Sequence, residues 1–428
     1  MVASLKNMDI LALARYYLTA ATCGLIVFSV TFQNSYNIFF ALILFSYIFF
    51  ISPKVRQNIH LSCFEISLII ILSLYIAAFI LEVFLFGEKA RLLDKPAKAL
   101  LLIPLIPILN AVRLEYRYIV TAFTISSVAL LLMAGYEIYI LDYDRAGRDI
   151  NPIQFSAIAI SIASVALALA ITTRNTKKAF LIPLVCLAAG GLWAGFLSQS
   201  KGSIIAIPII LFLIGCLYLS ELKVSKIKAA VYVSLLITLS TTALYNSSIK
   251  ERFQKSIENT LAFNEGSRTN TSSGIRLGQL KIALEAGQQS PLLGMGYSDF
   301  NSYKDQQVLA GRYGQELLKF DNSHNTYVNS FARRGLVGLL AVILFLGFPI
   351  YLGIQTWKKA PKEVAPYAVA LSAFGCVFFI ANITQEVIFL NTGIIMYTGL
   401  LVILTSMLAE RIKACESDPS GAQLPSNQ

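Results

Sequence analysis

The segment at 321–340, DNSHNTYVNSFARRGLVGLL, joins a histidine to an abrupt change from polar to apolar residues. His324 is one of two histidines in the 428-residue chain, and Arg333 and Arg334 stand directly before the apolar run. An imidazole titrates near neutral pH, and a cationic environment lowers its pKa and keeps it neutral. A neutral imidazole can accept a proton, so His324 is a candidate general base.

Two other basic residues occupy positions that favour an anionic ligand. Arg276 falls in the first turn of a helix expected over 274–289, where main-chain amides and the helix dipole already attract anions. A cation there is unfavourable unless an anion or an acidic partner lies nearby, and a salt bridge to a loop carboxylate is the structural alternative. Lys201, in SQSKGS, stands at the mouth of an apolar segment with no acidic neighbour in sequence.

The composition indicates a polytopic membrane protein. The chain is 56% hydrophobic and 14% charged, with a net charge of +11, whereas soluble domains carry about 25% charged residues. The first apolar segment lacks a small-residue cleavage site after it, so it is counted as a span. The six cysteines avoid the long polar loop, which predicts neither a structural disulfide nor a cysteine-based zinc site.

Twelve segments are apolar enough to span a bilayer, which takes roughly 20 residues. They are 13–31, 33–52, 62–86, 97–113, 117–140, 153–173, 179–197, 202–220, 227–245, 335–356, 364–383 and 388–409. Lysines and arginines gather in every second connection and at both termini, so the positive-inside rule places these in the cytoplasm.

The predicted fold is therefore an all-α polytopic membrane protein with about twelve transmembrane helices. Residues 1–245 hold the first nine helices, 246–334 form a long periplasmic helical loop, 335–410 hold the last three helices, and 411–428 form a disordered cytoplasmic tail. Asn322 or Ser323 is expected to cap the helix that enters the tenth span, and snorkelling to headgroups is expected for at least one of the two following arginines.

One short outer loop, FGEKARLLDKPAK, is basic in spite of its predicted location. It contains Arg91 and Lys98, and basic outer loops work against insertion. An anionic ligand at the outer membrane surface would explain them. The alternative is pairing of Arg91 and Lys95 with nearby acidic residues on an interfacial helix.

Three stretches resemble the bacterial O-antigen ligase family, which shares a superfamily with O-antigen polymerases and O-linking oligosaccharyltransferases. SHNTYVNSFARRGLVGLL is similar to the family's His-Asn-x-Tyr pattern ahead of a glycine-containing span. IRLGQLKIALEAGQQSPLLGMGYSDF resembles its arginine-bearing helix and Pro-Leu-x-Gly-x-Gly turn. SQSKGSIIAI resembles its Ser-Arg-Gly, with Lys201 in the arginine's place, which keeps the charge and loses the bidentate fork.

The resemblance implies transfer of O-polysaccharide from undecaprenyl diphosphate to a sugar of lipid A–core, at the periplasmic face of a Gram-negative inner membrane. His324 would be the base, Arg276 and Lys201 would stabilise the departing diphosphate, and Arg91 and Lys98 would help to recruit it. Candidates for orienting or binding sugar are Asn325, Tyr327 and Gln199. Membrane lipids are expected partners, whereas no cofactor, metal or nucleic acid is expected.

Other readings remain open at this stage. A polymerase would use a second lipid-linked glycan as acceptor, and an oligosaccharyltransferase a protein. A metal-dependent transferase would use Asp142 and Asp144 of LDYDRAGRD, although Arg145 and Arg148 make local ion pairing the alternative. A flippase or transporter would place ionisable groups near the bilayer midplane, where the spans here are almost free of charge.

Overall fold

The computed structural model describes residues 9–417 except 33, 149, 174–183 and 222–271, and every regular element in this part of the chain is a helix. Eight of its helices are long and apolar enough to cross a membrane, as a multi-pass integral membrane protein requires. They are α2 (Ile10–Phe28), α5 (Cys63–Phe86), α8 (Tyr116–Tyr139), α9 (Pro152–Ala170), the segment Gly202–Ser220, α18 (Thr326–Lys359), α19 (Ala365–Thr384) and α20 (Asn391–Ser417). The segment Gly202–Ser220 is divided between α12 (Lys201–Ile204) and α13 (Ala206–Glu221).

Three shorter apolar stretches coincide with the second, fourth and seventh predicted spans. The first is α3 (Ser35–Phe45) with η1 (Ser46–Ile51), the second is α6 (Pro96–Leu101) with α7 (Leu105–Val112), and the third ends in α11 (Gly190–Leu197). Pro104 stands at the start of α7, where its ring and missing N–H interrupt a continuous helix. The ninth predicted span, 227–245, lies outside the described residues, so a total of twelve stays a prediction.

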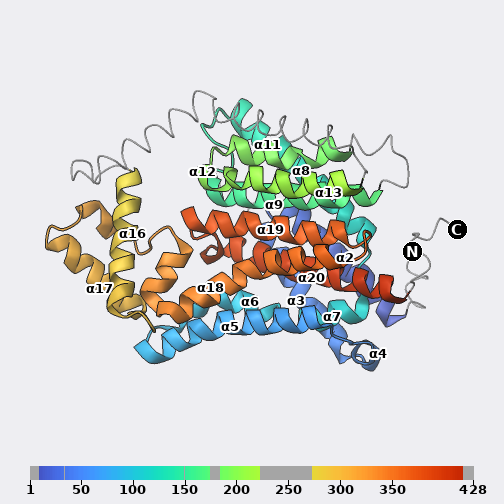
Figure 1. Ribbon diagram of the computed structural model, residues 1–428, viewed down its shortest axis with the longest axis horizontal. Coiled ribbons are helices and arrows are strands. Elements are labelled where there is room, and N and C mark those ends of the chain that lie inside the picture. The colour runs from blue at the N-terminus through green and yellow to red at the C-terminus, as the bar shows by residue number, and fades with distance from the viewer. Residues whose placement is uncertain (1–8, 33, 149, 174–183, 222–271, 418–428) are drawn as a thin grey trace.

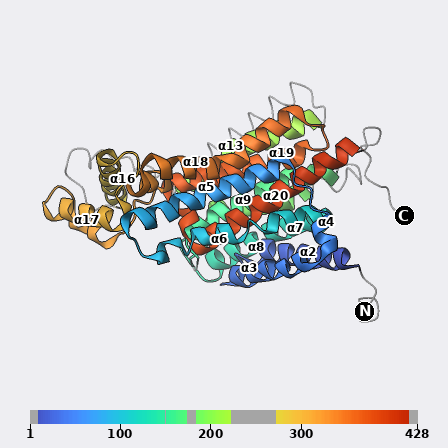
Figure 2. The same ribbon diagram turned by 90° about the horizontal axis from the view of Figure 1, so that it is seen from below.

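The most enclosed helices are α9, α19 and α20, whose side chains are mostly buried. Helix α18 packs against α5 and α19, and α5 also packs against α20 (Figures 1 and 2). Helices α16 (Ser272–Gln289) and α17 (Gly296–Leu309) project beyond one end of this bundle (Figure 1, left). They share a small apolar core with the start of α18. At the other end lie α4 (Pro53–Gln57), α7 and the end of α20 (Figure 1, right).

Some predicted element boundaries are wrong. Helix α16 begins at Ser272, two residues earlier than expected. Asn325, and neither Asn322 nor Ser323, caps α18, because its side-chain oxygen accepts hydrogen bonds from the backbone N–H groups of Tyr327 and Val328 at 3.0 Å. Helix α20 continues to Ser417, so the part of the predicted tail at 411–417 is helical.

Candidate functional site

A break within α18 determines how the segment around His324 enters the bundle. Gly335 has φ 58° and ψ −152°, so the chain leaves helical geometry there and resumes it in the next residue. A backbone conformation with positive φ favours glycine at that position. A Cβ at Gly335 would also overlap the backbone of Leu292, so the close approach of another chain segment requires glycine at this position.

The segment that approaches Gly335 is the SPLLGMG turn that follows α16. Leu336 N–H donates to the Pro291 carbonyl at 2.7 Å, and Met295 N–H donates to the Ala332 carbonyl at 3.0 Å. Gly294, with φ 73°, lies so close to the Arg333 backbone that a Cβ would not fit. These contacts satisfy backbone groups that the break in α18 releases. The glycine-containing turn therefore fastens α16 to the start of α18, and it is no phosphate-binding loop.

His324 lies between η4 (Gln315–Lys319) and α18 in the left-handed backbone region, with φ 53°. Its Nδ1 is 3.0 Å from the Gln385 Oε1 atom, and its ring packs edge-on against Phe320 at 5.7 Å between centroids. With the amide oxygen facing the ring, Nδ1 carries the proton, which leaves Nε2 as the basic nitrogen. His324 precedes Asn325, the cap of α18, so it lies outside that helix.

Burial lowers the pKa of His324, and the nearby charge of Arg276 lowers it further, while the hydrogen bond to Gln385 opposes both. The imidazole is half-buried. Both main effects favour the neutral ring. This electrostatic environment suits a group that must accept a proton.

Arg276 lies in the first two turns of α16, near enough for its charge to act on His324. Its side chain reaches the surface, yet crowding by protein atoms lowers the pKa of the guanidinium. Within the described part of the chain, no carboxylate forms an ion pair with Arg276, so the salt-bridge alternative finds no support there. A cation near a helix N-terminus that has no ion pair with the described residues is suited to binding an anion.

Lys201 begins α12, and nothing is described of its side chain. Its backbone position is fixed by Gly202, where a Cβ would overlap the Thr384 hydroxyl at the end of α19. Thr384 directly precedes Gln385, the partner of His324. The three segments singled out from sequence therefore meet around the last residues of α19.

Gln199 also has a left-handed backbone, with φ 53°. Its Nε2 donates to the Asp144 carbonyl at 2.9 Å, while its buried Oε1 has no hydrogen-bond partner among the described residues. The side chains of Asp142 and Asp144 are exposed, and Arg148 lies over the ring of Tyr143 at 4.7 Å. Gln199 thus ties the LDYDRAGRD loop to the SQSKGS segment.

The other two candidates for sugar binding have structural partners. Asn325 caps α18, as described above, and Tyr327 O–H donates to the Phe379 carbonyl on α19 at 2.7 Å. Thr326 O–H also bonds to Asn382 at 2.7 Å on the same helix. These contacts lock the first turn of α18 onto α19 and so position His324 against Gln385.

Two charged residues of the FGEKARLLDKPAK loop have partners outside the loop. Glu88 accepts hydrogen bonds from Ser298 N–H and O–H on α17 at 2.6 and 2.8 Å. Among the described residues, no ion pair joins Arg91 or Lys95 to Glu88 or Asp94, so the local-pairing alternative for these two is not supported. Arg91 is exposed on η2 (Ala90–Leu93), and the Lys98 ammonium donates to the Asn391 amide oxygen at 2.7 Å.

The side chains of Arg333 and Arg334 pair with a carboxylate of the protein and do not extend to lipid headgroups. Arg334 is buried and lies 2.7 Å from Glu82 on α5, and Arg333 lies 3.1 Å from the other oxygen of the same carboxylate. Arg334 also covers the ring of Phe79 at 3.9 Å. The expectation of snorkelling is wrong, because Glu82 supplies a counter-charge from 251 residues away in sequence. This shared carboxylate ties α5 to the break in α18.

Glu386 is a residue that sequence reasoning left without a role. It is 5% exposed, follows Gln385 and has one carboxyl oxygen, Oε1, without a hydrogen-bond partner. Burial raises its pKa to about 7, although the charges of Arg333 and Arg334 and a backbone hydrogen bond from Ser323 act in the opposite direction. The available signal was its position as the lone charge in the connection at 384–387.

Comparison with known proteins gives a family match that covers the candidate site residues Lys201, Arg276 and His324. The sequence model for O-antigen ligase matches residues 184–343. An uncharacterized protein of Haemophilus influenzae is 26% identical over 359 residues, which is 82% of this chain and 88% of that protein. The matched segment contains the Lys201, Arg276 and His324 positions and the break in α18. The match falls on the family that the sequence motifs indicated, and residues 184–343 of this chain are similar to the O-antigen ligase family.

Proposed function

We propose that this chain is an O-antigen ligase that transfers O-polysaccharide from undecaprenyl diphosphate to a sugar hydroxyl of lipid A–core. The observation that carries the proposal is the meeting of three segments at the end of α19. His324 is held there by Gln385, Arg276 acts on the imidazole through its charge, and the start of α12 packs against Thr384. A neutral base beside cations fits a transfer in which a hydroxyl attacks and a diphosphate departs.

In the proposed reaction, Nε2 of His324 takes the proton from the acceptor hydroxyl. The hydroxyl oxygen forms a bond to the anomeric carbon of the donor while the bond from that carbon to the diphosphate oxygen breaks. Undecaprenyl diphosphate leaves with the bonding electrons, and Arg276 and Lys201 stabilise its growing negative charge. General-base assistance of this kind contributes roughly 10²- to 10⁴-fold.

The remaining candidates take supporting roles in this proposal. Arg91 and Lys98 attract the diphosphate towards the site, since Arg91 has an exposed side chain and both lie on the loop tied to α17 by Glu88. Asn325 and Tyr327 position the histidine. Gln199 has an orienting role, because its amide holds the SQSKGS segment against the Asp144 backbone. The site faces the periplasm of a Gram-negative inner membrane, with both termini in the cytoplasm.

The test is the lipopolysaccharide profile of a deletion strain complemented with variants of this chain. His324→Ala, Arg276→Ala and Lys201→Ala should each remove most of the O-antigen ladder from core while the protein remains in the membrane. Lys319→Ala is the matched control, because its side chain is 69% exposed, its ion pair among the described residues is with Glu316, and it precedes the same polar segment. A full ladder at normal levels with His324→Ala would show that the base is assigned wrongly.

The deletion strain also separates a ligase from a polymerase. Loss of a ligase leaves bare core together with accumulated long lipid-linked polymer. Loss of a polymerase leaves core that carries a single repeat unit. The second pattern would assign this chain to polymerisation, with the same donor and the same catalytic residues.

A further inference from the structure

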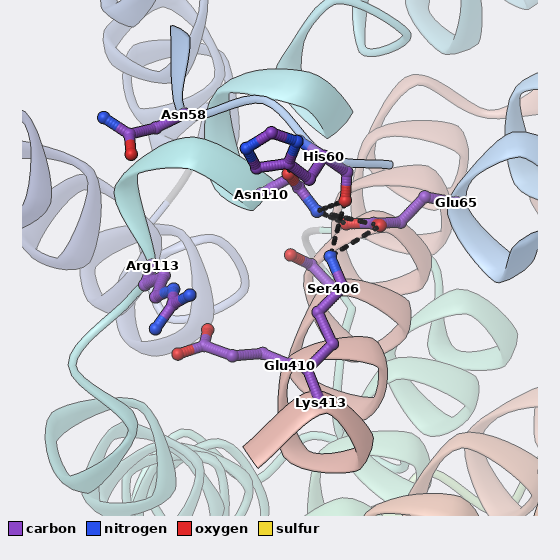
Figure 3. Close-up of a pocket in the computed structure, with 8 residues that line it drawn as sticks. All are labelled: Asn58, His60, Glu65, Asn110, Arg113, Ser406, Glu410 and Lys413. Carbon is purple, nitrogen blue, oxygen red and sulfur yellow. Dashed lines mark hydrogen bonds and ion pairs between the residues drawn. The ribbon is translucent and has the colours of Figure 1, made fainter. Parts of the chain in front are cut away.

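A polar cavity of about 190 Å³ lies at the end of the bundle remote from His324. It is enclosed by the connection before α5, the end of α7 and the last turns of α20 (Figure 3). A single buried water needs only about 10–15 Å³, so the cavity has room for a ligand of several atoms. Its walls carry charges of both signs, from Arg113 and Lys413 and from Glu65 and Glu410.

The two carboxylates are already held by protein donors. Glu65 accepts hydrogen bonds from Ser62 N–H and O–H, both at 2.7 Å, and from the Asn110 amide at 2.9 and 3.0 Å. Tyr116 O–H donates to one oxygen of Glu410. Asn110 and Ser62 thus fix Glu65 as part of the wall, whereas the described residues supply a hydrogen-bond donor to only one oxygen of Glu410.

The two cations differ in how far they are engaged. Lys413 donates to the His60 carbonyl at 2.6 Å and lies 4.0 Å from Glu65. Arg113, which ends α7 with φ 57°, has no hydrogen bond or ion pair from its guanidinium among the described residues. Figure 3 shows Arg113 and Glu410 pointing toward one another across the cavity. The Arg113 guanidinium therefore faces the Glu410 carboxylate across the cavity, and the described part of the chain holds no ion pair between the two.

Helix α5, whose first turn contributes Glu65 to the cavity wall, also has an exposed apolar face. Glu65 lies in the first turn of α5, and Ile66, Ile70 and Leu74 follow on one face of that helix at a spacing of four residues. These three side chains are 45–52% exposed. A ligand with a polar headgroup in the cavity could lay an acyl chain along this face.

We propose that the cavity binds the headgroup of a membrane phospholipid that carries both a phosphodiester and a primary amine. Arg113 and Lys413 bind the phosphate, because guanidinium and ammonium groups form short, charge-assisted hydrogen bonds to phosphate oxygens. Glu410 accepts from the amine, and the acyl chains follow the exposed face of α5. Basic pockets between helices on the cytoplasmic side are a known type of headgroup site. In this cavity the Glu410 carboxylate adds a requirement for an amine in the headgroup.

The test measures which lipid the full-length protein retains. The protein is reconstituted in nanodiscs that contain equal amounts of phosphatidylethanolamine, phosphatidylcholine and phosphatidylglycerol, then extracted in mild detergent, and the bound lipid is counted by native mass spectrometry. Wild type should retain phosphatidylethanolamine over the other two lipids. Arg113→Ala should lower that retention by roughly tenfold, as expected for the loss of a hydrogen bond to a charged group.

Glu410→Gln distinguishes recognition of the amine from recognition of phosphate alone. It should abolish the preference for phosphatidylethanolamine over phosphatidylcholine while total retained lipid stays near wild type. Lys359→Ala, at the exposed end of α18, is the control and should behave as wild type. Equal retention of the three lipids by wild type, or an unchanged preference in both Arg113→Ala and Glu410→Gln, would overturn the proposal. Competition by free phosphate as effective as that by lipid would overturn the assignment to a phospholipid.

Discussion

Replacing Gln385 with glutamate should move the acidic limb of the pH–activity profile to higher pH. In the wild type, burial and Arg276 lower the pKa of His324 below its usual 6.5, so under the proposed function the base would stay neutral and active below that pH. The substituted carboxylate would lie where the amide oxygen is now, 3.0 Å from Nδ1. An opposite charge at such a distance raises the pKa of an imidazole by about 1–3 pH units. Because only the neutral ring accepts a proton, activity below the new pKa should fall about tenfold for each pH unit by which that pKa rises.

The assay is transfer of O-polysaccharide to lipid A–core by the purified chain in vesicles, between about pH 5 and pH 9. Gln385→Leu is the matched control. It removes the hydrogen bond that raises the pKa of His324 and adds no charge, so its acidic limb should not move to higher pH. Both variants are also measured with Glu386→Gln, because Glu386 itself has a pKa of about 7. An acidic limb in Gln385→Glu that coincides with the wild type would refute the assignment of His324 as the titrating base.

Three further predictions concern the elements around this site. Glu82→Gln leaves Arg334 buried without a counter-ion and should destabilise the fold by about 3–5 kcal/mol, seen as a lower Tm in detergent, whereas a loss under about 1 kcal/mol would mean that Arg334 finds another partner. Gly335→Ala should lower Tm far more than Gly311→Ala, since both have positive φ but only Gly335 faces another backbone segment; equal losses would show that φ alone matters. Glu386 has a folded pKa of about 7 against an ordinary 4.5, so its stabilising proton is fully present below pH 4.5 and lost as pH rises through 7. Glu386→Gln should therefore abolish a decline in stability of roughly 3 kcal/mol across that range, and an unchanged pH dependence of Tm would contradict the buried carboxyl's role.

The membrane helices were predictable because a bilayer demands long apolar segments whatever their partners. Helices α5, α8 and α19 follow the predicted spans closely. The break in α18 was not predictable in the same way. RRGLVGLL reads as the start of a continuous helix, and a glycine within a helix usually costs only about 1 kcal/mol. Gly335 is needed for its contact with Leu292, which no local pattern contains.

In the candidate site, too, the local sequence predicted some residues but not the distant residues that contact them. Residue type and local context were enough to select His324 and Arg276. The partners that hold the histidine came from α19, 61 residues away from His324 in the case of Gln385. The pairing of Arg333 and Arg334 with Glu82 joins segments still further apart. Sequence spacing within one helix cannot predict such pairs, which is why membrane headgroups were wrongly chosen as the partners of these arginines.

Under the proposed function, the charges around His324 would link its proton affinity to the presence of the diphosphate. In the unliganded site, Arg276 lowers the pKa of the imidazole, which keeps the ring neutral and ready to accept a proton. Under the proposed function, a diphosphate bound by Arg276 would offset that cation and raise the proton affinity of His324. Negative charge on the diphosphate grows further as the bond to the anomeric carbon breaks, at the stage when the acceptor hydroxyl loses its proton. Removal of Arg276 should therefore affect both steps together, since the same cation stabilises the leaving group and couples its charge to the base.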